Sequence, residues 1–404
     1  MVLRKCYWRP RVLFLLTSGV CAGVTFGLVA SPSEPVSVQQ SLAQAALTEI
    51  LQRGAPILGF DTGCDPALNA TCDWMAKIPD DTELVHMSIP GTHDSSTWNY
   101  TQATQNSLLG YTGPIEPAEY FQCQEHSYFQ MLEGGIRVFD LRVALNPGNG
   151  TIGFYHSQAL LAPDTRLEDV LFGFYYWLDA HPTEAVFLSI NYEGGTGTQD
   201  TLAFQEQLYD ILSGDLATKY WVQVNGTLGT LGEARGKLTL LQRFDYSLLP
   251  NTSEYSKRFG IHLDPEDWHD NDPNITLVYN TVNGTEQIAY IEVSKDYYEM
   301  DGLPSSAGAA ENIQWKYNAT IAHLQDAINP DLHPDQLYIT FASSEHDTNG
   351  ETPRIMALGN GSDVPGVNQK ILPWLQENKG KRFGIVMLDF FDSVPGVVEA
   401  IINA

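Results

Sequence analysis

Short runs of apolar and β-branched residues recur along the chain from about residue 83 onward, and most are followed by a segment with helical periodicity. Continuous apolar runs of this length predict strands buried on both faces, as in a parallel sheet. Eight runs are present: Leu84–Ile89, Val138–Leu141, Ile152–Tyr155, Ala185–Ile190, Leu238–Leu241, Ala289–Val293, Leu337–Phe341 and Gly384–Leu388.

The segments between these runs have the apolar spacing of amphipathic helices. The clearest are Phe121–Glu133, Leu167–Ala180, Leu202–Leu212, Ile321–Ile328 and Val367–Asn378. Strands that alternate with helices predict an α/β fold, and eight such strands predict a closed (β/α)8 barrel of TIM type. Only nine residues, 143–151, separate the second and third runs. A crossover helix needs more, so the barrel is irregular there or the two strands form a hairpin.

The beginning of the chain has a different pattern. Arg4, Lys5, Arg9 and Arg11 precede an uncharged stretch from Val12 to Ala30, which is the layout of a secretory leader. Nineteen uncharged residues can also just span a bilayer, so a retained type II anchor is the alternative to a cleaved signal peptide. We expect three parts: this leader over 1–30, a linker with a short helix near Ser41–Arg53 over 31–82, and one catalytic barrel domain over 83–404.

Acceptor motifs for N-glycosylation and the cysteine pattern both favour export. The motif Asn-x-Ser/Thr occurs at Asn69, Asn99, Asn149, Asn225, Asn251, Asn274, Asn283, Asn318 and Asn360, more often than chance would produce. Cys6 and Cys21 lie in the leader, Cys64 and Cys72 are spaced for a local disulfide, and Cys123 is left over. Two cysteines without nearby histidines do not favour a metal site. We therefore expect a secreted glycoprotein.

Composition and charge narrow the classes of partner. The chain is 43% hydrophobic, which excludes a disordered protein, and its formal net charge is −27. Such a surface repels nucleic acid and anionic bilayers. We expect no nucleic-acid partner and a monomer that contacts membrane surfaces only transiently, without a basic patch.

Polar side chains follow the predicted strands, and the first of them stand out. Pro90 and Gly91 are expected to end the first strand in a sharp turn that presents His93 beside Asp94. In barrels of this type the chemistry gathers where the strands end. Reading those ends gives His93, Asp94, Asp140, Arg142, His156, Asn191, Glu193, Arg243, Asp296, Tyr298, Ser343 and Asp389. Two histidines with an arginine suit phosphoryl transfer, because one imidazole can remove a proton, the other can supply one, and the guanidinium balances phosphoryl charge.

The residues at these ends resemble a known family. Four motifs match the phosphatidylinositol-specific phospholipase C X-domain family, in particular its bacterial metal-independent branch: Ile89-Pro90-Gly91-Thr92-His93-Asp94-Ser95, Gly135-Ile136-Arg137-Val138-Phe139-Asp140-Leu141-Arg142, Tyr155-His156 and Leu388-Asp389-Phe390. Gly236–Arg243 and Leu337–Phe341 also match, so the resemblance runs from about Leu84 to Phe391.

The resemblance implies a role for each matched residue. His93 would be the general base, oriented by Asp389, and His156 the general acid, assisted by Asp94. Arg142 would stabilise the phosphorus centre with Asp140 nearby, and Arg243 would hold hydroxyls of the headgroup. The family's reaction is attack by the inositol 2-hydroxyl, which expels diacylglycerol and leaves a 1,2-cyclic phosphate. No external nucleophile is needed, which agrees with the lack of a Gly-x-Ser-x-Gly elbow.

The motifs also predict that no metal cofactor is used. Calcium-dependent animal relatives place an Asn after the first His and a Glu-x-Asp pair on the second strand, whereas this chain has Asp94 and Asp140-Leu141-Arg142. A guanidinium repels Ca²⁺ and can replace its charge. The acidic cluster His269-Asp270-Asn271-Asp272 could supply ligands, but Pro273 and its loop setting favour a solvated turn.

Two departures from the family concern headgroup contacts. Asn191, followed by Glu193, stands where bacterial members carry an inositol-contacting Lys. After the sixth strand, the family's Asp-x-Tyr fits Asp296 and Tyr298 only with a one-residue insertion, whereas an ungapped pairing places Lys295 and Tyr297 there.

Two other functions compete with an exported phosphodiesterase. A metal-dependent glycerophosphodiester phosphodiesterase would use the same barrel, but it needs a His-Arg-Gly start and a Glu-x-Asp pair that the matching strand ends lack. A glycosylated protein that binds inositol headgroups without cleaving them is the third hypothesis. A pure binder has no need of two proton-transfer groups, so the set His93, Arg142, His156 and Asp389 argues against it.

Overall fold

The computed structural model describes residues 37–64, 69–148, 150–194, 198–269, 271–272, 274–293, 306–346, 350–361 and 363–404. The chain divides into two compact units, 1–45 and 46–404. The described part of the first unit is the beginning of helix α1 (Val38–Leu58), and all other described elements belong to the second. The expected division at residues 30 and 82 stays a prediction, and the leader lies outside the described residues.

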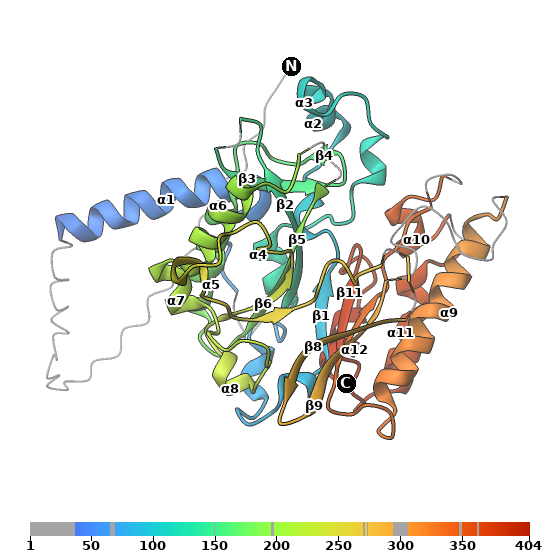
Figure 1. The fold of residues 1–404 in the computed structure, drawn as a ribbon. Helices are drawn as coiled ribbons and strands as arrows, with labels where there is room; N and C mark the ends of the chain where they lie inside the picture. Colours follow the sequence, from blue (N-terminus) through green and yellow to red (C-terminus); the bar gives the residue numbers. More distant parts are fainter. Residues whose placement is uncertain are drawn as a thin grey trace, which may run out of the picture. The chain divides into compact units, whose positions relative to one another are not determined.

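A single sheet organises the second unit (Figure 1). Its strands are β1 (Ile89–Thr92), β2 (Val138–Leu145), β3 (Ile152–His156), β4 (Ala159–Leu160), β5 (Val186–Tyr192), β6 (Leu238–Arg243), β7 (Ile261–His262), β8 (Ile275–Val282), β9 (Thr285–Glu292), β10 (Leu337–Phe341) and β11 (Ile385–Leu388). The order β7-β6-β5-β2-β1-β11-β10-β9 is parallel throughout, and β8 is antiparallel to β9. No strand pairing joins β7 to β8 in the described part of the chain, so the TIM-type barrel is nearly closed.

The irregularity predicted between the second and third runs is a hairpin. β3 pairs antiparallel with the end of β2, and β5 takes the parallel position beside β2. The prediction of a barrel strand at Ile152–Tyr155 is therefore wrong. The eighth parallel strand is β7, which has two residues and is too short to stand out as an apolar run.

The first strand was also misplaced by the sequence pattern. Residues Leu84–His86 form the 3₁₀ helix η2, and β1 begins at Ile89, so Pro90 and Gly91 lie inside the strand rather than ending it. A side chain at Gly91 would lie 2.5 Å from Met387 Sδ and 2.9 Å from Val138 Cβ. Glycine is therefore required by the close approach of β1 to its neighbours, and the turn comes later, at Asp94.

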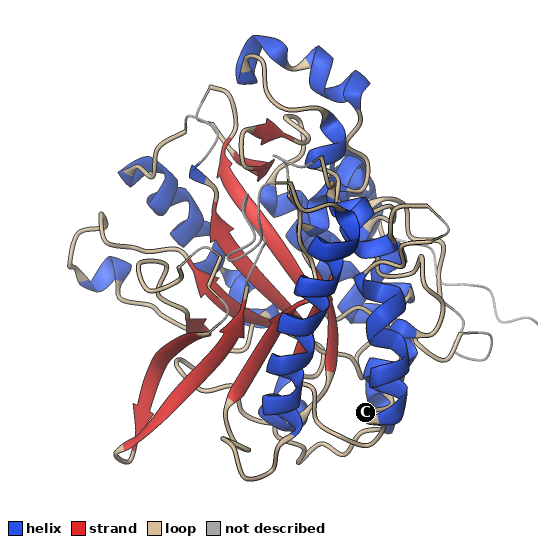
Figure 2. Ribbon diagram, turned by 90° about the vertical axis from the view of Figure 1, so that its right-hand side faces the viewer, coloured by secondary structure: helices blue, strands red, loops and turns tan. Residues whose placement is uncertain are grey.

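Helices pack on the outer face of the sheet (Figure 2). The remaining helices are α2 (Gln102–Ser107), α3 (Leu109–Thr112), α4 (Tyr128–Glu133), α5 (Leu167–Ala180), α6 (Leu202–Ser213), α7 (Asp215–Tyr220), α8 (Leu231–Ala234), α9 (Ala309–Ile328), α10 (Pro353–Leu358), α11 (Val367–Glu377) and α12 (Val397–Ile402). Short 3₁₀ helices are η1 (Trp74–Lys77), η3 (Ser95–Thr97), η4 (Ala118–Tyr120) and η6 (Ser253–Tyr255). The expected helix at Phe121–Glu133 forms only from Tyr128, because residues 121–124 bind the strand ends through their backbone and side chains, as described below.

Buried apolar side chains form one core inside the barrel and another between the sheet and the helices, because successive side chains of a strand point to opposite faces of the sheet. On β2, Val138 points into the barrel and Phe139 and Leu141 point outward to the helices. The inner core also contains Trp74, Leu84 and Leu231, from η1, η2 and α8. Inward positions near the carboxyl ends of the strands are polar, so the alternation leaves one end of the barrel for chemistry.

The predicted disulfide between Cys64 and Cys72 is present, and Cys123 is a free, buried thiol. Within the ranges described above, no helix combines the length and the apolar character that crossing a bilayer requires.

Candidate active site

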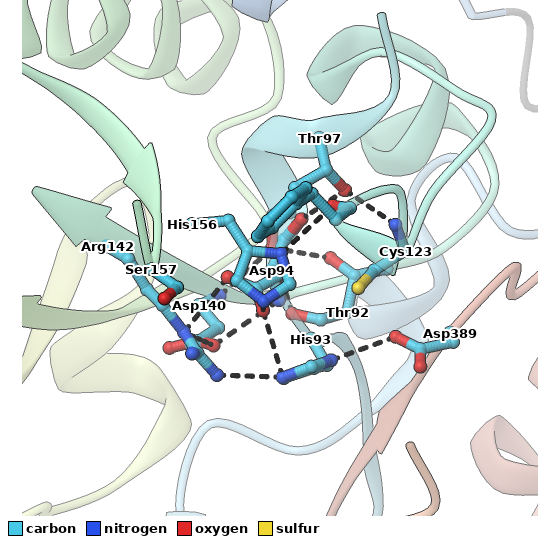
Figure 3. A network of polar contacts seen from close by, with 12 residues as sticks. Thr92, His93, Asp94, Thr97, Cys123, Asp140, Arg142, His156, Ser157 and Asp389 are labelled. Atoms are coloured by element: carbon cyan, nitrogen blue, oxygen red, sulfur yellow. Dashed lines mark hydrogen bonds and ion pairs between the residues drawn. The ribbon is translucent and has the colours of Figure 1, made fainter. Parts of the chain in front are cut away.

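The candidate site lies where inward positions of neighbouring strands come together. Arg142 on β2, Asn191 on β5 and Arg243 on β6 are register partners across three strands. His93 follows β1, and Asp389 follows the adjacent β11. The sequence predicted these residues from their positions after apolar runs, and the barrel brings them to one end of the sheet. Figure 3 shows His93, Arg142 and Asp389 close together there.

His93 is held by a carboxylate on one side and a guanidinium on the other. Its Nδ1 lies 3.0 Å from Asp389 Oδ1, and its Nε2 lies 2.8 Å from Arg142 Nη2. A guanidinium can only donate, so Nε2 carries a lone pair and Nδ1 carries the proton that Asp389 accepts. This tautomer leaves Nε2 as the atom that can take a proton.

His156, the last residue of β3, has the equivalent arrangement with a different partner. Its Nδ1 lies 2.9 Å from the carbonyl oxygen of Phe121. Since a carbonyl can only accept, Nδ1 carries the proton and Nε2 is the atom that gains or loses one. The side chain exposes 10% of its surface, so this atom lies in a largely desolvated environment.

One carboxylate oxygen lies between the two imidazoles. Asp94 Oδ2 is 3.1 Å from His93 Nε2 and 3.2 Å from His156 Nε2. The ring centroids are 6.4 Å apart and the rings are nearly perpendicular. Two proton-transfer groups therefore face a common space, with Asp94 within reach of both.

Arg142 and Arg243 neutralise the carboxylates beneath this space. Arg142 Nε lies 2.9 Å from Asp94 Oδ1 and 3.3 Å from Asp140 Oδ2, and Arg243 Nη1 lies 3.2 Å from Asp140 Oδ1. Asp140 also accepts from the backbone amide of Asp94 at 3.3 Å. Asp140 therefore holds both guanidinium groups in place, and each of its oxygens accepts a hydrogen bond within the site.

The pKa values of buried groups follow from these contacts. Burial, and then the charge of Arg142, lowers the pKa of His156 to about 4, against the opposing effect of its hydrogen bond to Phe121. Burial alone would raise the pKa of Asp140, but the charges of Arg142, Arg243 and His93 lower it. Burial raises the pKa of the Glu193 carboxyl. At neutral pH the ligand-free site thus holds an uncharged His156.

The donor atoms available to a metal ion are few. His93, Asp94 and Cys123 offer ligand atoms within 4.8 Å of one another. Burial beside Asp389 and Asp94 raises the pKa of the Cys123 thiol, whereas zinc binds thiolate. Arg142 also contacts both His93 and Asp94, so a positive charge already lies at this position.

Other predicted site residues are Asp296, Tyr298 and Glu193. Asp296 and Tyr298 fall outside the described residues, as does part of the acidic cluster around His269. Glu193, directly after β5, accepts a hydrogen bond from the Ser157 amide at 3.0 Å and lies 4.0 Å from Arg142.

Three contributing residues were not identified from the sequence. Phe121 supplies the carbonyl for His156. Gln124 Nε2 donates to the carbonyls of both His93 and Leu388 at 2.8 Å, which ties the ends of β1 and β11 together. Trp268 stacks on the Arg243 guanidinium at 3.8 Å. Each lies outside the helices and strands of the structure, and for Phe121 and Gln124 the apolar spacing predicted a helix instead.

Comparison with known proteins identifies related sequences and structures. No family model matches the chain. The human PI-PLC X domain-containing protein 1 is 30% identical over 334 residues, which cover 75% of this chain and 94% of that protein. The 1-phosphatidylinositol phosphodiesterase of Listeria monocytogenes is 28% identical over 193 residues, 47% of this chain, and the match spans just over half (55%) of that enzyme. Among solved structures, a mutant phosphatidylinositol-specific phospholipase C from Staphylococcus aureus aligns with a TM-score of 0.60 at 22% identity, covering 82% of this chain and 96% of that one.

Proposed function

Because this chain belongs to the PI-PLC X domain family, we propose that it is a phospholipase C-type phosphodiesterase that cleaves phosphatidylinositol or a related inositol phosphodiester. The observation that carries the proposal is the pair of imidazoles facing one space, His93 and His156, with Arg142 against one of them. Relatives of this chain are named 1-phosphatidylinositol phosphodiesterases.

In this mechanism the substrate supplies its own nucleophile. His93 Nε2 takes the proton of the inositol 2-hydroxyl, whose oxygen forms a bond to phosphorus. The bond from phosphorus to the diacylglycerol oxygen breaks, and His156 Nε2 gives that oxygen a proton. The products are a cyclic inositol phosphate and diacylglycerol. His93 takes up one proton and His156 releases one, so the reaction causes no net change in the number of protons on the protein. Each proton transfer contributes ~10²–10⁴ in rate.

His156 must be protonated for its part, although its pKa is about 4 in the ligand-free protein. A bound phosphodiester brings a negative charge close to the ring, and an opposite charge favours the protonated form. Asp94 Oδ2, 3.2 Å from Nε2, then accepts the new hydrogen bond. Substrate binding therefore prepares the acid.

We further propose that Arg142 replaces the charge of a metal ion and that Arg243 binds the headgroup. Arg142 stabilises negative charge on the phosphoryl oxygens as it develops, while Asp140 fixes the guanidinium direction. Arg243, held by Asp140 and Trp268, provides donors for headgroup hydroxyls next to Asn191. The chemistry then needs no added cation.

The test uses phosphatidylinositol vesicles in EDTA and measures released water-soluble inositol phosphate. The wild-type protein is expected to cleave the lipid. The kcat of His93→Ala and of His156→Ala should be lower by about 100-fold or more, which is the contribution of one general acid or base. His86→Ala is the matched control, because His86 is exposed on η2 and pairs with Asp335. Loss of wild-type turnover in EDTA would support a metal-dependent phosphodiesterase. Binding without turnover would support a headgroup-binding protein.

We also propose that the protein is exported and glycosylated. Seven acceptor asparagines are exposed: Asn99, Asn225, Asn251, Asn274, Asn283, Asn318 and Asn360. Asn69 is half-buried, and its Nδ2 donates to the carbonyl of Glu133 at 2.9 Å. Glycopeptide mapping of protein secreted from eukaryotic cells should find glycans at exposed acceptors and none at Asn69. Glycan-free protein in the medium would contradict the proposal.

A further inference from the structure

Three residues at the site have a backbone conformation that is rare outside glycine, and each directly follows a proposed proton-transfer or orienting group. Asp94 follows His93, Ser157 follows His156, and Phe390 follows Asp389, with φ values of 41°, 48° and 45°. Left-handed conformations of this kind are costly for residues with a Cβ atom. They persist where the surrounding structure holds them, which is common at functional sites.

Each of these residues is held by a hydrogen bond from its own amide. The Asp94 amide donates to Asp140 Oδ2 at 3.3 Å, and the Phe390 amide donates to the Cys123 carbonyl at 2.9 Å. The Ser157 amide donates to Glu193 Oε1 at 3.0 Å. Glu193 is the one acceptor of the three that is a side chain without a role in the mechanism above.

The contact between the Ser157 amide and Glu193 matters most of the three, because Ser157 lies in a tight turn. β3 ends at His156 and β4 begins at Ala159, and these two residues are register partners, so Ser157 and Gln158 form a two-residue hairpin turn. A positive φ at the first central residue of such a turn favours glycine strongly. This chain places a serine there, next to the acid. The turn therefore relies on a contact from outside the hairpin.

Glu193 is well placed to supply that contact. It follows β5, the strand parallel to β2, and its amide donates to the Val143 carbonyl, so its backbone is fixed by the sheet. Its side chain is 12% exposed, and Oε2 lies 4.0 Å from Arg142 Nη1. One carboxylate thus links the barrel sheet to the hairpin that carries His156.

We propose that Glu193 is a positioning residue for the general acid, which it fixes through the Ser157 amide, and not a headgroup ligand. The inference rests on the proposed function, since it assigns Glu193 a part in the same reaction. Because the turn is only two residues long, relaxation of Ser157 would turn the His156 ring away from Asp94 and the leaving oxygen. A misplacement of about 1 Å can cost on the order of 100-fold in rate.

The test compares Glu193→Ala in two backgrounds. In the wild-type background we expect kcat to fall between about 10- and 100-fold with KM changed less than about twofold. In the Ser157→Gly background, Glu193→Ala should lower kcat by less than about threefold, because glycine adopts the left-handed conformation without help from Glu193. Glu193→Gln, which keeps an acceptor oxygen, should retain most of the activity.

Glu233→Ala is the matched control, because Glu233 also accepts a backbone amide, that of Thr230 at 2.9 Å, but far from the site in α8. It should leave kcat unchanged. An equal loss from Glu193→Ala in both backgrounds would overturn the proposal. So would a raised KM with unchanged kcat, which would indicate direct headgroup binding.

A measurement without substrate separates this inference from the proposed function. Nitrogen-correlated NMR of the His156 ring should show the Nδ1–H tautomer in wild type, a mixture of tautomers in Glu193→Ala, and recovery in the double variant with Ser157→Gly. If wild type fails to cleave any inositol lipid but the ring responds in this way, the positioning role stands and the proposed reaction is wrong. An unchanged ring in Glu193→Ala would overturn the positioning role.

Discussion

At the scale of single residues, the site is built from polar partners that fix tautomers rather than from exposed charges. Asp389 and Arg142 set the proton on His93, and the Phe121 carbonyl sets the proton on His156. The sequence identified the side chains that project from strand ends. It could not identify Phe121 or Gln124, because a backbone carbonyl and a loop amide leave no mark in a hydrophobic pattern.

Replacing Asp389 with Asn tests the tautomer of His93. An amide can donate to Nδ1, which would move the ring proton to Nε2 and remove the base, so kcat should fall on the order of 100-fold or more. Asp392→Asn is the control, since Asp392 lies three residues further on and pairs with the half-exposed His126. Steady-state kinetics on phosphatidylinositol would measure both, and similar losses in the two variants would contradict the assignment.

The protonation of His156 gives a second test at this scale. An NMR titration of the ligand-free protein should place the His156 pKa near 4, because the ring is buried beside Arg142. Addition of a soluble inositol phosphate should raise that pKa, since the anion stabilises the imidazolium. A pKa near 6.5 that does not respond to the ligand would show that the site does not tune this residue.

At the scale of elements, seven of the eight apolar runs coincide with strands of the sheet, whereas Leu84–Ile89 overlaps β1 only at its last residue. The predicted helices at Leu167–Ala180 and Leu202–Leu212 are confirmed, and the second continues to Ser213. β7 was missed because two residues make no pattern. The expected helix from Phe121 was wrong because polar contacts with β1, β3 and β11 outweigh helical propensity over residues 121–124.

The close approach of β1 to its neighbours can be tested at Gly91. Gly91→Ala would place a Cβ 2.5 Å from Met387 Sδ and 2.9 Å from Val138 Cβ, so it should lower the free energy of unfolding by about 1–3 kcal/mol. Gly110→Ala in α3 meets nothing within 4 Å and should be neutral or slightly stabilising. Urea denaturation followed by circular dichroism would measure both. Equal stability of the two variants would contradict the tight packing at β1.

At the scale of the whole molecule, the TIM-type barrel places its reactive groups at one end and its apolar inner core at the other. The sequence predicted where the reactive groups lie, because polar residues follow the apolar runs at the strand ends. The sequence predicted a closed barrel, whereas no strand pairing joins β7 to β8 among the described residues. This gap could not be predicted, because the sequences of β7 and of the β8–β9 hairpin carry no information on pairing partners.

Buried neutral histidines make the stability of the molecule depend on pH. Burial lowers the pKa of His156 to about 4 and that of His323 to about 3, below the unfolded value of about 6.5. Between these values the unfolded state binds more protons, so the free energy of unfolding falls as pH drops from about 6.5 toward 4, by ~3 kcal/mol per histidine.

Urea denaturation at a series of pH values would measure this fall. His323→Gln removes one buried imidazole and keeps a partner for the Thr340 hydroxyl that His323 contacts at 2.7 Å. The variant should therefore lose less stability between pH 6.5 and 4 than wild type does. An identical pH dependence in the two proteins would contradict the claim that the buried, neutral His323 makes stability fall at low pH.

The central claim is that two imidazoles 6.4 Å apart drive attack by the substrate's own hydroxyl on its phosphorus. A ³¹P NMR time course with phosphatidylinositol in EDTA tests this claim most directly, because a five-membered cyclic phosphate has a distinct resonance. The account predicts that this resonance appears first with wild type and is absent with His93→Ala or His156→Ala. Formation of an acyclic inositol phosphate without the cyclic intermediate, or no cleavage of any inositol lipid, would contradict it.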